Sequence, residues 1–415
     1  MEKSEYYHKT KIHIVMLLYW ILLISWQIFR PVTNRSFLDV IVKCCLMAIP
    51  LLYALSVTKG SIKYRISSLI LLLFFLVNQM ITVLVNEGSL SLSVIVTILF
   101  TSVSYFIYMI MLDHEQLTLK QLLNLYDSFI ACSFILAVYN VTFGWSRFSQ
   151  ILKITGAYSH ETRSILKSNH EFALYLIFGI IMCIFCIKKK ENRKSVIKYY
   201  FCILFLAINL ISTFSRTSIL SLFVCLLILV FFYNRKAFPK YILVIGFVIL
   251  FIVVCPPIRT YVFEVIMKSN TDARRLSLLT YGANLISNLD PLHLFYGIGY
   301  TDFSMELYHA LQNTSLHNSY LTVLVNGGIM MFIFYTVIIV SSINTAWDCR
   351  KFDKFSGSLF LGLIVLSLLF MTTATSIIFT SQLDSYTLTM FTIIIPKYYK
   401  NHVTSIGLNG VNNNT

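Results

Sequence analysis

Residues 315–340 read SLHNSYLTVLVNGGIMMFIFYTVIIV. From Leu321 to Val340 the stretch is predominantly apolar, and roughly 20 apolar residues in a helix rising 1.5 Å per residue cross a bilayer core. The run therefore predicts a transmembrane helix. The residues before it are polar and include His317, which places an ionisable side chain where this helix meets a water-facing loop. Such a side chain at a membrane boundary is a candidate functional group.

The composition extends this prediction to the whole chain. Hydrophobic residues make up 57% of the sequence, charged residues 12%, and the mean hydropathy is +0.75. A soluble domain of 415 residues with this composition would expose large apolar patches, so we expect an integral membrane protein. Its apolar runs are continuous rather than alternating, which indicates helices.

The predicted fold class is therefore all-α: a polytopic protein with about twelve transmembrane helices that form a single membrane domain over residues 1–415. The predicted spans lie near residues 12–29, 37–57, 66–85, 92–112, 124–143, 171–187, 197–213, 216–233, 240–256, 320–343, 356–378 and 382–396.

Lys and Arg predict the orientation, because short cytoplasmic loops are enriched in both. The basic segments that alternate with the spans are residues 59–65, 113–120, 188–198, 234–240, 350–354 and 397–402. Both termini are therefore predicted to be cytoplasmic, with a disordered tail over residues 403–415. This topology explains much of the net charge of +15, so the charge does not indicate a nucleic-acid partner. Most of the nine cysteines lie in apolar spans, without the paired CxxC pattern of a metal site.

Two long loops remain on the predicted outer face, residues 144–169 and 257–318. Apolar residues recur at helical spacing in the second loop, among them Leu276, Leu279 and Leu285. We expect short helices there on or against the membrane surface, in a large and partly helical extracytoplasmic loop. A small soluble domain is the alternative, although about sixty residues is marginal for an independent core.

Three sets of cationic or titratable residues fall on this predicted outer face. Arg216 opens the eighth span, Arg274 and Arg275 lie in the large loop, and His317 opens the tenth span. Each of these residues could also have a purely structural role. Arg216 can extend to the headgroups, the arginine pair can contact phospholipid or water, and a histidine at a helix end can be a capping residue.

The ordered motifs around these residues resemble the O-antigen ligase and polymerase superfamily of bacterial membrane glycosyltransferases. They are Ser215-Arg216-Thr217, the segment from Arg275 to Ile286, Pro291, Gly297-Ile298-Gly299-Tyr300 with Phe303, His317-Asn318-Ser319-Tyr320-Leu321, and Gly327-Gly328-Ile329. Many relatives carry an aromatic residue four positions after the loop arginine, where this chain has Leu279. The choice of Arg275 over Arg274 as the functional loop arginine depends on that register.

The resemblance implies a GT-C-like membrane enzyme whose donor glycan is linked through pyrophosphate to undecaprenol. An acceptor hydroxyl displaces the lipid pyrophosphate, and arginine suits this leaving group because it stays protonated and binds phosphate oxygens bidentately. Arg216 and Arg275 are the expected pyrophosphate ligands. The further substrate-binding residues expected are Arg274, Arg163, Arg147, Asn318 and Tyr320.

His317 is the expected general base for the acceptor hydroxyl, with Asn318 orienting the ring or a sugar hydroxyl. Direct displacement would invert the anomeric centre. Neither a cofactor nor a metal is expected. Glu306 and His309 could join His317 as ligands, but their spacing is not an established ligand pattern, and the chain has no Asp-x-Asp. The His160-Glu161 and His170-Glu171 pairs are predicted to be solvated or to contact the acceptor.

The function predicted is polymerisation of lipid-linked repeat units into a surface polysaccharide, such as capsule or exopolysaccharide, at the outer leaflet of the bacterial cytoplasmic membrane. A ligase that moves finished glycan to another acceptor is the first alternative, and a transporter of lipid-linked sugars is the second. The chain shows no internal repeat of the kind transporters carry. The expected partners are the undecaprenyl-pyrophosphate-linked donor and acceptor, membrane lipids, and a chain-length regulator and flippase of the same pathway.

Overall fold

The computed structural model of the chain describes residues 12–33, 36–58, 65–86, 92–149, 162–166, 168–190, 193–256, 259, 269–299, 316–374, 376–380 and 382–412. The regular elements in these residues are all helices, which confirms the all-α class. They group into two compact units. The first unit comprises residues 1–118, 274–348 and 367–415, and the second comprises residues 119–273 and 349–366.

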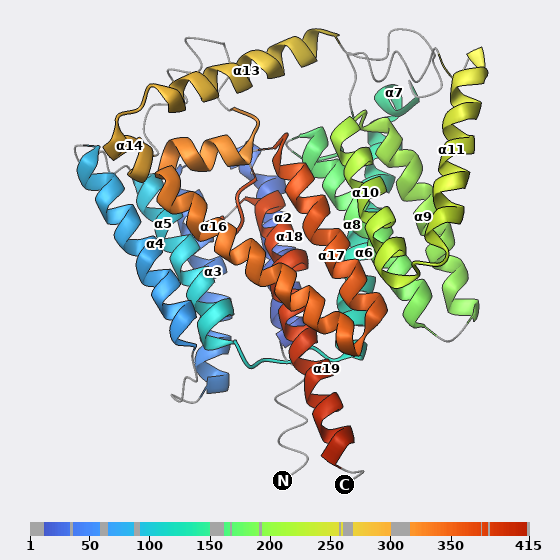
Figure 1. Cartoon of the computed structure of the whole chain (residues 1–415), viewed down its shortest axis with the longest axis horizontal. Coiled ribbons are helices and arrows are strands. Elements are labelled where there is room, and N and C mark those ends of the chain that lie inside the picture. Colours follow the sequence, from blue (N-terminus) through green and yellow to red (C-terminus); the bar gives the residue numbers. More distant parts are fainter. Residues whose placement is uncertain are drawn as a thin grey trace. The chain divides into compact units, whose positions relative to one another are not determined.

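The first unit is built from long apolar helices and from short helices of the large predicted loop (Figure 1). Its elements are α2 (Ile12–Thr33), α3 (Ser36–Thr58), α4 (Ile66–Val85), α5 (Leu92–Tyr105), the π-helical η1 (Phe106–Met111), α13 (Ser269–Ser287, from Arg274 on), α14 (Pro291–Tyr296), α16 (Ser319–Phe352, as far as Asp348), α18 (Leu383–Thr389), the π-helical η4 (Met390–Ile394) and α19 (Ile395–Asn412).

The second unit is centred on α8, whose residues are buried along almost its whole length where it packs against α6 and α9. Its elements are α6 (Leu119–Phe143), α7 (Trp145–Phe148), α8 (Asn169–Lys189), α9 (Arg193–Ser212), α10 (Arg216–Tyr233) and α11 (Phe238–Val254). It also takes in the last residues of α16 and the first part of α17 (Lys354–Met371).

Each predicted span overlaps a helical segment, and the predicted bounds 66–85 and 216–233 are those of α4 and α10. The predicted span 356–378 extends past α17, which ends at Met371. In the described part of the chain, 8 helices are long and apolar enough to cross a membrane. Two shorter apolar stretches, Ile12–Trp26 and Val196–Ser212, accompany them, and α11 has 17 residues. The chain is therefore a multi-pass membrane protein. The twelfth predicted span is divided among α18, η4 and α19.

The predicted disordered tail begins at residue 403, whereas α19 is helical to Asn412. The Oγ of Ser405 donates a hydrogen bond to the side chain of Gln116 at 3.4 Å, and the Nδ2 of Asn401 donates to the Asp113 carbonyl at 2.7 Å. These bonds tie the start of the tail to the segment after η1, which explains why the helix continues there.

The predicted helices of the large loop are present as α13 and α14, and Leu285 of the predicted apolar stripe packs against a buried cluster. Leu278 is buried with Leu316 and Val325, whereas Leu276 is 65% exposed. The α14 helix begins at Pro291, because the Asp290 carboxylate accepts hydrogen bonds from the amides of Leu292 and His293. The hydrogen bond from the His293 amide lowers the pKa of Asp290.

The tenth predicted span is interrupted inside the bilayer-length helix α16. Gly328 has φ 65° and ψ −169°, a conformation that glycine alone adopts readily. A break at this point frees the carbonyl groups of the preceding turn from their helical partners, and a polar group left unsatisfied in hydrocarbon costs several kcal/mol. The structure must therefore supply other donors.

The Gly297-Ile298-Gly299 turn supplies two of these donors. The amide of Ile298 donates to the Val325 carbonyl at 2.9 Å, and the amide of Gly299 donates to the Asn326 carbonyl at 3.0 Å. Asn78 of α4 supplies a third, since its Nδ2 lies 3.4 Å from the Gly327 carbonyl oxygen. Three consecutive carbonyls of the broken helix thus gain partners from the loop and from α4.

The turn is held in place by the same face of α4. Thr82 donates to the Tyr296 carbonyl at 2.6 Å, and Asn86, in the cap after the helix, donates to the Gly297 carbonyl at 3.2 Å. Asn78, Thr82 and Asn86 are spaced by four residues, so they lie on one side of the helix. This set of contacts among the turn, the break and α4 is called the turn–break lock below.

We predict that Gly328→Ala destabilises the protein strongly. A Cβ at Gly328 would lie 2.2 Å from the Phe295 carbonyl oxygen, on a backbone conformation that alanine strains to adopt. The expected loss is roughly 2 kcal/mol or more, measured as a lower thermal unfolding midpoint of the purified protein in detergent. Gly246→Ala is the control, since no atom lies within 4 Å of its Cβ position, and it should unfold at or above the wild-type temperature. If Gly328→Ala unfolded at the same temperature as the wild type, this account would be contradicted.

Candidate functional site

His317 stands at the start of α16 in a strained backbone conformation. Its φ is 49°, in the left-handed region that few residues other than glycine, asparagine and aspartate adopt, and its side chain is exposed. Strain of this kind persists only where the surroundings fix the backbone. Leu316 before it is buried against α13 residue Leu278, and Asn318 after it caps the helix. Both neighbours therefore hold His317 in place.

Asn318 is the N-cap of α16. Its Oδ1 accepts a hydrogen bond from the amide of Leu321 at 3.0 Å, and its backbone carbonyl accepts from the amide of Thr322 at 3.0 Å. Its Nδ2 donates to the Thr372 carbonyl at 3.2 Å, in the segment after α17. The side chain that the sequence assigned to ring orientation or substrate thus has both of its polar atoms engaged in fixing the helix start.

The next two residues continue this attachment. Ser319 donates to the Ala374 carbonyl at 2.6 Å, and the hydroxyl of Tyr320 donates to the Leu368 carbonyl at 2.8 Å. The role of Tyr320 in substrate binding stays a prediction, and its hydroxyl donates to the end of α17 in the first unit. The start of α16 is therefore fixed at several successive residues. Within the motif of residues 317–321, His317 is the residue that is most exposed.

A buried carboxylate that the sequence analysis did not single out lies behind this segment. Asp384 of α18 is 9% exposed, and its carboxylate accepts hydrogen bonds from the Ser376 hydroxyl and from the Ser385 amide. Ser376 in turn offers its carbonyl to Ser319 at 3.1 Å. An acidic residue within an apolar run was the available signal, because such residues are costly in a membrane and usually have a function or a polar partner.

In the second unit, Arg216 is the first residue of α10, as the sequence predicted. A left-handed backbone conformation and side-chain hydrogen bonds fix the residues just before it. Phe214 has φ 49°, and the Ser215 hydroxyl lies 2.7 Å from that of Ser218. His170 Nδ1 lies 3.0 Å from the Ser215 hydroxyl. His170 is half-buried against the motif serine and is not a purely solvated group.

A buried polar network supports the same segment. Asn140 of α6 donates to the Asn209 side chain at 3.0 Å and lies 3.4 Å from the Ser212 hydroxyl, which also pairs with Thr162 at 2.7 Å. Asn169 donates to the Thr213 carbonyl at 3.2 Å. Buried polar groups that all have partners specify one arrangement of the backbone. The start of α10 is thus fixed by α6 and by residues that precede or begin α8.

Arg163 borders a pocket of the second unit beside this network. The pocket has a volume of about 330 Å³ and is lined by Tyr139, Asn140, Phe143, Gly144, Ser146, Thr162, Arg163 and Ser164. It combines amide, hydroxyl and guanidinium groups with aromatic rings, and Phe143 is 77% exposed. Such a mixture is typical of sites that bind polar organic ligands.

The other predicted arginines are placed through their backbone. Arg274 and Arg275 belong to α13, within one helical turn of the buried Leu278, and Arg147 belongs to α7. Arg216, Arg163 and Arg147 belong to the second unit, whereas His317, Arg274 and Arg275 belong to the first. Glu306 and His309, considered above as metal ligands, lie outside the described residues, as do His160 and Glu161.

Residues 201–336 match the family model described as O-Antigen ligase. The match supports the resemblance of this part of the chain to the O-antigen ligase/polymerase superfamily. The matched region runs from α9 to α16 and contains Arg216, the Gly297-Ile298-Gly299 turn, His317 and the break at Gly328. Members of that family are membrane glycosyltransferase-like enzymes of ligase or polymerase type. No curated protein matches the chain in a sequence search.

Substitutions of Asn318 can distinguish its role as the N-cap of α16 from a role in substrate binding. Asn318→Ala should lower the free energy of unfolding by about 1 kcal/mol, because the N-cap acceptor is lost. Asn318→Ser keeps an oxygen at the cap and should recover most of that loss. Thermal unfolding of the two variants is the measurement. If Asn318→Ala unfolds like the wild type and loses only activity, Asn318 acts on substrate and the cap is unimportant.

Proposed function

We propose that this protein polymerises undecaprenyl-pyrophosphate-linked oligosaccharide repeat units into a surface polysaccharide on the outer face of the cytoplasmic membrane. The observation that carries the proposal is His317, held in a left-handed conformation at the start of α16 inside the matched O-antigen ligase region. A side chain fixed on a rigid helix end is suited to chemistry that needs precise positioning.

His317 acts as the general base in this proposal. A neutral imidazole removes the proton of an acceptor hydroxyl as the oxygen attacks the anomeric carbon of the donor sugar. The bond from that carbon to the lipid pyrophosphate breaks, and the pyrophosphate leaves with the electron pair. One direct displacement inverts the anomeric centre. The donor carries its own high-energy linkage, so the reaction draws on no nucleotide and no cofactor.

Arginine side chains stabilise the departing pyrophosphate. Arg216 is the main candidate because the buried network of the second unit fixes the helix start that bears it. Arg275 is proposed from its motif, with Arg274 as the second choice in the same turn of α13. The guanidinium group stays protonated and binds phosphate oxygens bidentately, so no metal ion is required for this role.

The pocket bordered by Arg163 is the proposed place for sugar residues of the glycan. Asn140, Thr162 and Arg163 offer hydrogen-bonding groups, and Tyr139 and Phe143 offer aromatic surface. Arg147 belongs to α7, which directly follows this end of α6, and is assigned to the same role. The chain-length regulator, the flippase and the lipid-linked acceptor remain expected partners.

A ligase is the second candidate, favoured by the description of the matched family. The two activities use the same donor and leaving group and differ in the acceptor. Loss of a polymerase leaves single repeat units on the final acceptor, whereas loss of a ligase leaves long chains on the lipid carrier. The glycans that accumulate in an inactive variant therefore distinguish the two.

We predict that His317→Asn abolishes transfer while leaving the fold intact. Asparagine tolerates the left-handed backbone at this position but cannot act as the base, whereas alanine would add backbone strain to the result. The expected rate falls by about 100-fold or more, measured as polymer formed in membranes supplied with lipid-linked repeat units.

The matched control is His114→Ala, which removes an exposed histidine from the segment after η1. This variant should polymerise at the wild-type rate. If His317→Asn made polymer as fast as the wild type, His317 would not be the base. If His317→Asn made polymer at the wild-type rate but unfolded at a lower temperature than the wild type, His317 would serve the stability of the fold and not catalysis.

A further inference from the structure

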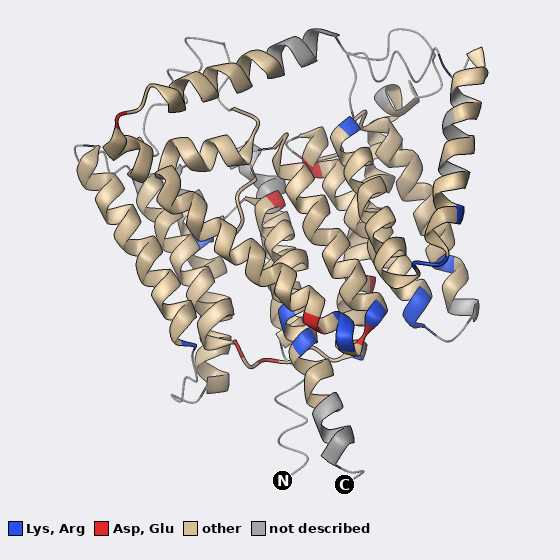
Figure 2. Ribbon diagram, in the orientation of Figure 1, with Lys and Arg blue, Asp and Glu red and all other residues tan. Residues whose placement is uncertain are grey.

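A second polar pocket lies in the first unit, at the end where α4 begins and where α16 approaches Asp348. It is lined by residues of α4, η1, the segment after η1, α16, η4 and α19, and its polar members include Arg65, Ser68, Ser341, Ser342, Thr345 and Lys400. His317 stands at the other end of α16, so this pocket lies apart from the candidate catalytic residue of the same unit. Figure 2 shows basic residues in blue and acidic residues in red near the start of α19.

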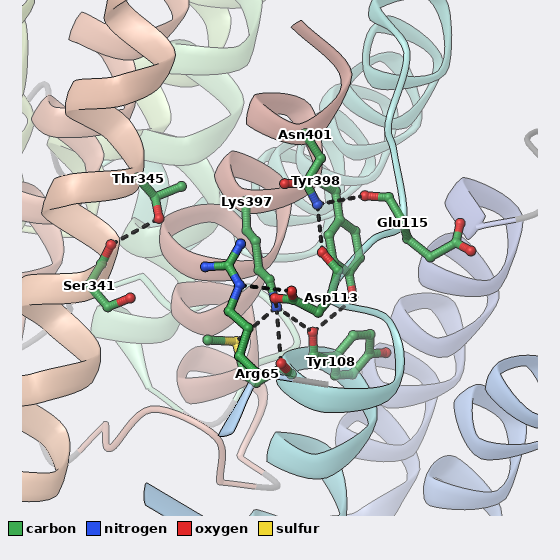
Figure 3. Close-up of polar contacts among 10 residues, drawn as sticks. Arg65, Tyr108, Asp113, Glu115, Ser341, Thr345, Lys397, Tyr398 and Asn401 are labelled. Atoms are coloured by element: carbon green, nitrogen blue, oxygen red, sulfur yellow. Dashed lines mark hydrogen bonds and ion pairs between the residues drawn. The ribbon is translucent and has the colours of Figure 1, made fainter. Parts of the chain in front are cut away.

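A buried carboxylate organises the cations of this pocket (Figure 3). Asp113 is 2% exposed, and its Oδ1 lies 2.8 Å from Lys397 Nζ while its Oδ2 lies 3.0 Å from Arg65 Nε. Removing one partner of a buried ion pair is costly, so this arrangement is fixed. Arg65 nevertheless keeps 62% of its side chain exposed, with its Nε facing Asp113.

The π-helical segments complete the base of the pocket. In η1 the Leu112 amide bonds to the Ile107 carbonyl, five residues back, and Lys397 Nζ reaches the carbonyls of Tyr108 and Met109 at 3.1 and 3.3 Å. Ile393 of η4 also lines the pocket. Such segments carry a cost in backbone hydrogen bonding and are frequent at functional sites.

The remaining walls add one more cation and several hydroxyl groups. Lys400 is 25% exposed and is oriented by Asp348 at 2.8 Å. Ser341 presents a hydroxyl from α16 that can donate to an anion, whereas the hydroxyls of Ser342 and Thr345 donate to backbone carbonyls of α16, both at 2.9 Å. The lining contains three cations, Arg65, Lys397 and Lys400. Two carboxylates, Asp113 and Asp348, pair with them, which leaves an excess of one positive charge.

We propose that this pocket binds a phosphate group, with Arg65 and Lys400 as its charged ligands and the hydroxyl of Ser341 as a neutral donor. Arginine and lysine beside a hydroxyl donor are a common phosphate-binding set. The pocket opens at the ends of membrane-length helices, where lipid headgroups lie, and basic pockets between such helices bind anionic headgroups. An anionic phospholipid is one source of the phosphate, and a soluble phosphate ester is the other.

The test is ligand-dependent thermal stabilisation of the purified full-length protein in detergent. Phosphatidylglycerol, phosphatidylcholine and soluble glycerol phosphate are titrated separately into the wild type, Arg65→Gln and Lys400→Gln. Phosphatidylglycerol should raise the unfolding midpoint of the wild type. Each variant should need about fivefold more of it for the same shift, since one basic residue is lost.

Lys236→Gln is the matched control, because it removes an exposed lysine from the connection between α10 and α11, outside the pocket. It should respond like the wild type, as should Arg65→Lys and Lys400→Arg, which keep the charge. If glycerol phosphate alone stabilises the wild type and this effect is lost in the pocket variants, the site takes a soluble ester. Equal responses of pocket and control variants to every ligand would overturn the proposal.

Discussion

The structure of the first unit depends on the hydrogen bonds that repair the break in α16. A helix interrupted at Gly328 would leave carbonyl groups without partners in a membrane, where no water replaces them. Two amides of the Gly297-Ile298-Gly299 turn and the side chain of Asn78 fill that need. Gly297 and Gly328 lie close together, because a Cβ at Gly328 would lie 2.6 Å from the amide nitrogen of Gly297. The break is therefore possible only if the loop is docked.

Docking of the loop has consequences for the candidate site. It brings α14 onto α4 and lets α13 bury Leu278 against Leu316, the residue next to His317. On the other side of His317, Asn318 and Ser319 attach the helix to the segment after α17. The second unit uses a comparable device, a buried network of asparagine, serine and threonine around the start of α10. In each unit, fixed polar contacts present one ionisable residue of the family motif at a helix start.

The sequence was sufficient to predict most helices, because apolar runs of bilayer length have few alternative structures; the bounds of α4 and α10 were predicted to the residue. The motif also indicated the helices of the large loop and the glycines of the turn. It could not indicate which face of α13 is buried, since Leu276 and Leu278 are equally apolar and a membrane protein can leave either exposed. The partners that α4 provides, Asn78 for the break and Thr82 and Asn86 for the turn, lie more than 200 positions away in the chain, beyond any local pattern. For the same reason, the sequence could not indicate the hydrogen bonds of Asn318 and Tyr320 to Thr372 and Leu368.

Amide hydrogen exchange at Ile298 and Gly299 tests the turn–break lock most directly. Both amides donate to carbonyls of the broken helix, so they should exchange as slowly as amides inside the helices of the first unit. The protein is held in lipid nanodiscs, and deuterium uptake is followed over hours in peptides that cover residues 297–299. Slow exchange at these two positions is the result that the structure predicts. Exchange as fast as that of an unstructured loop would show that the turn is not docked on α16, and the account of how His317 is held would fail with it.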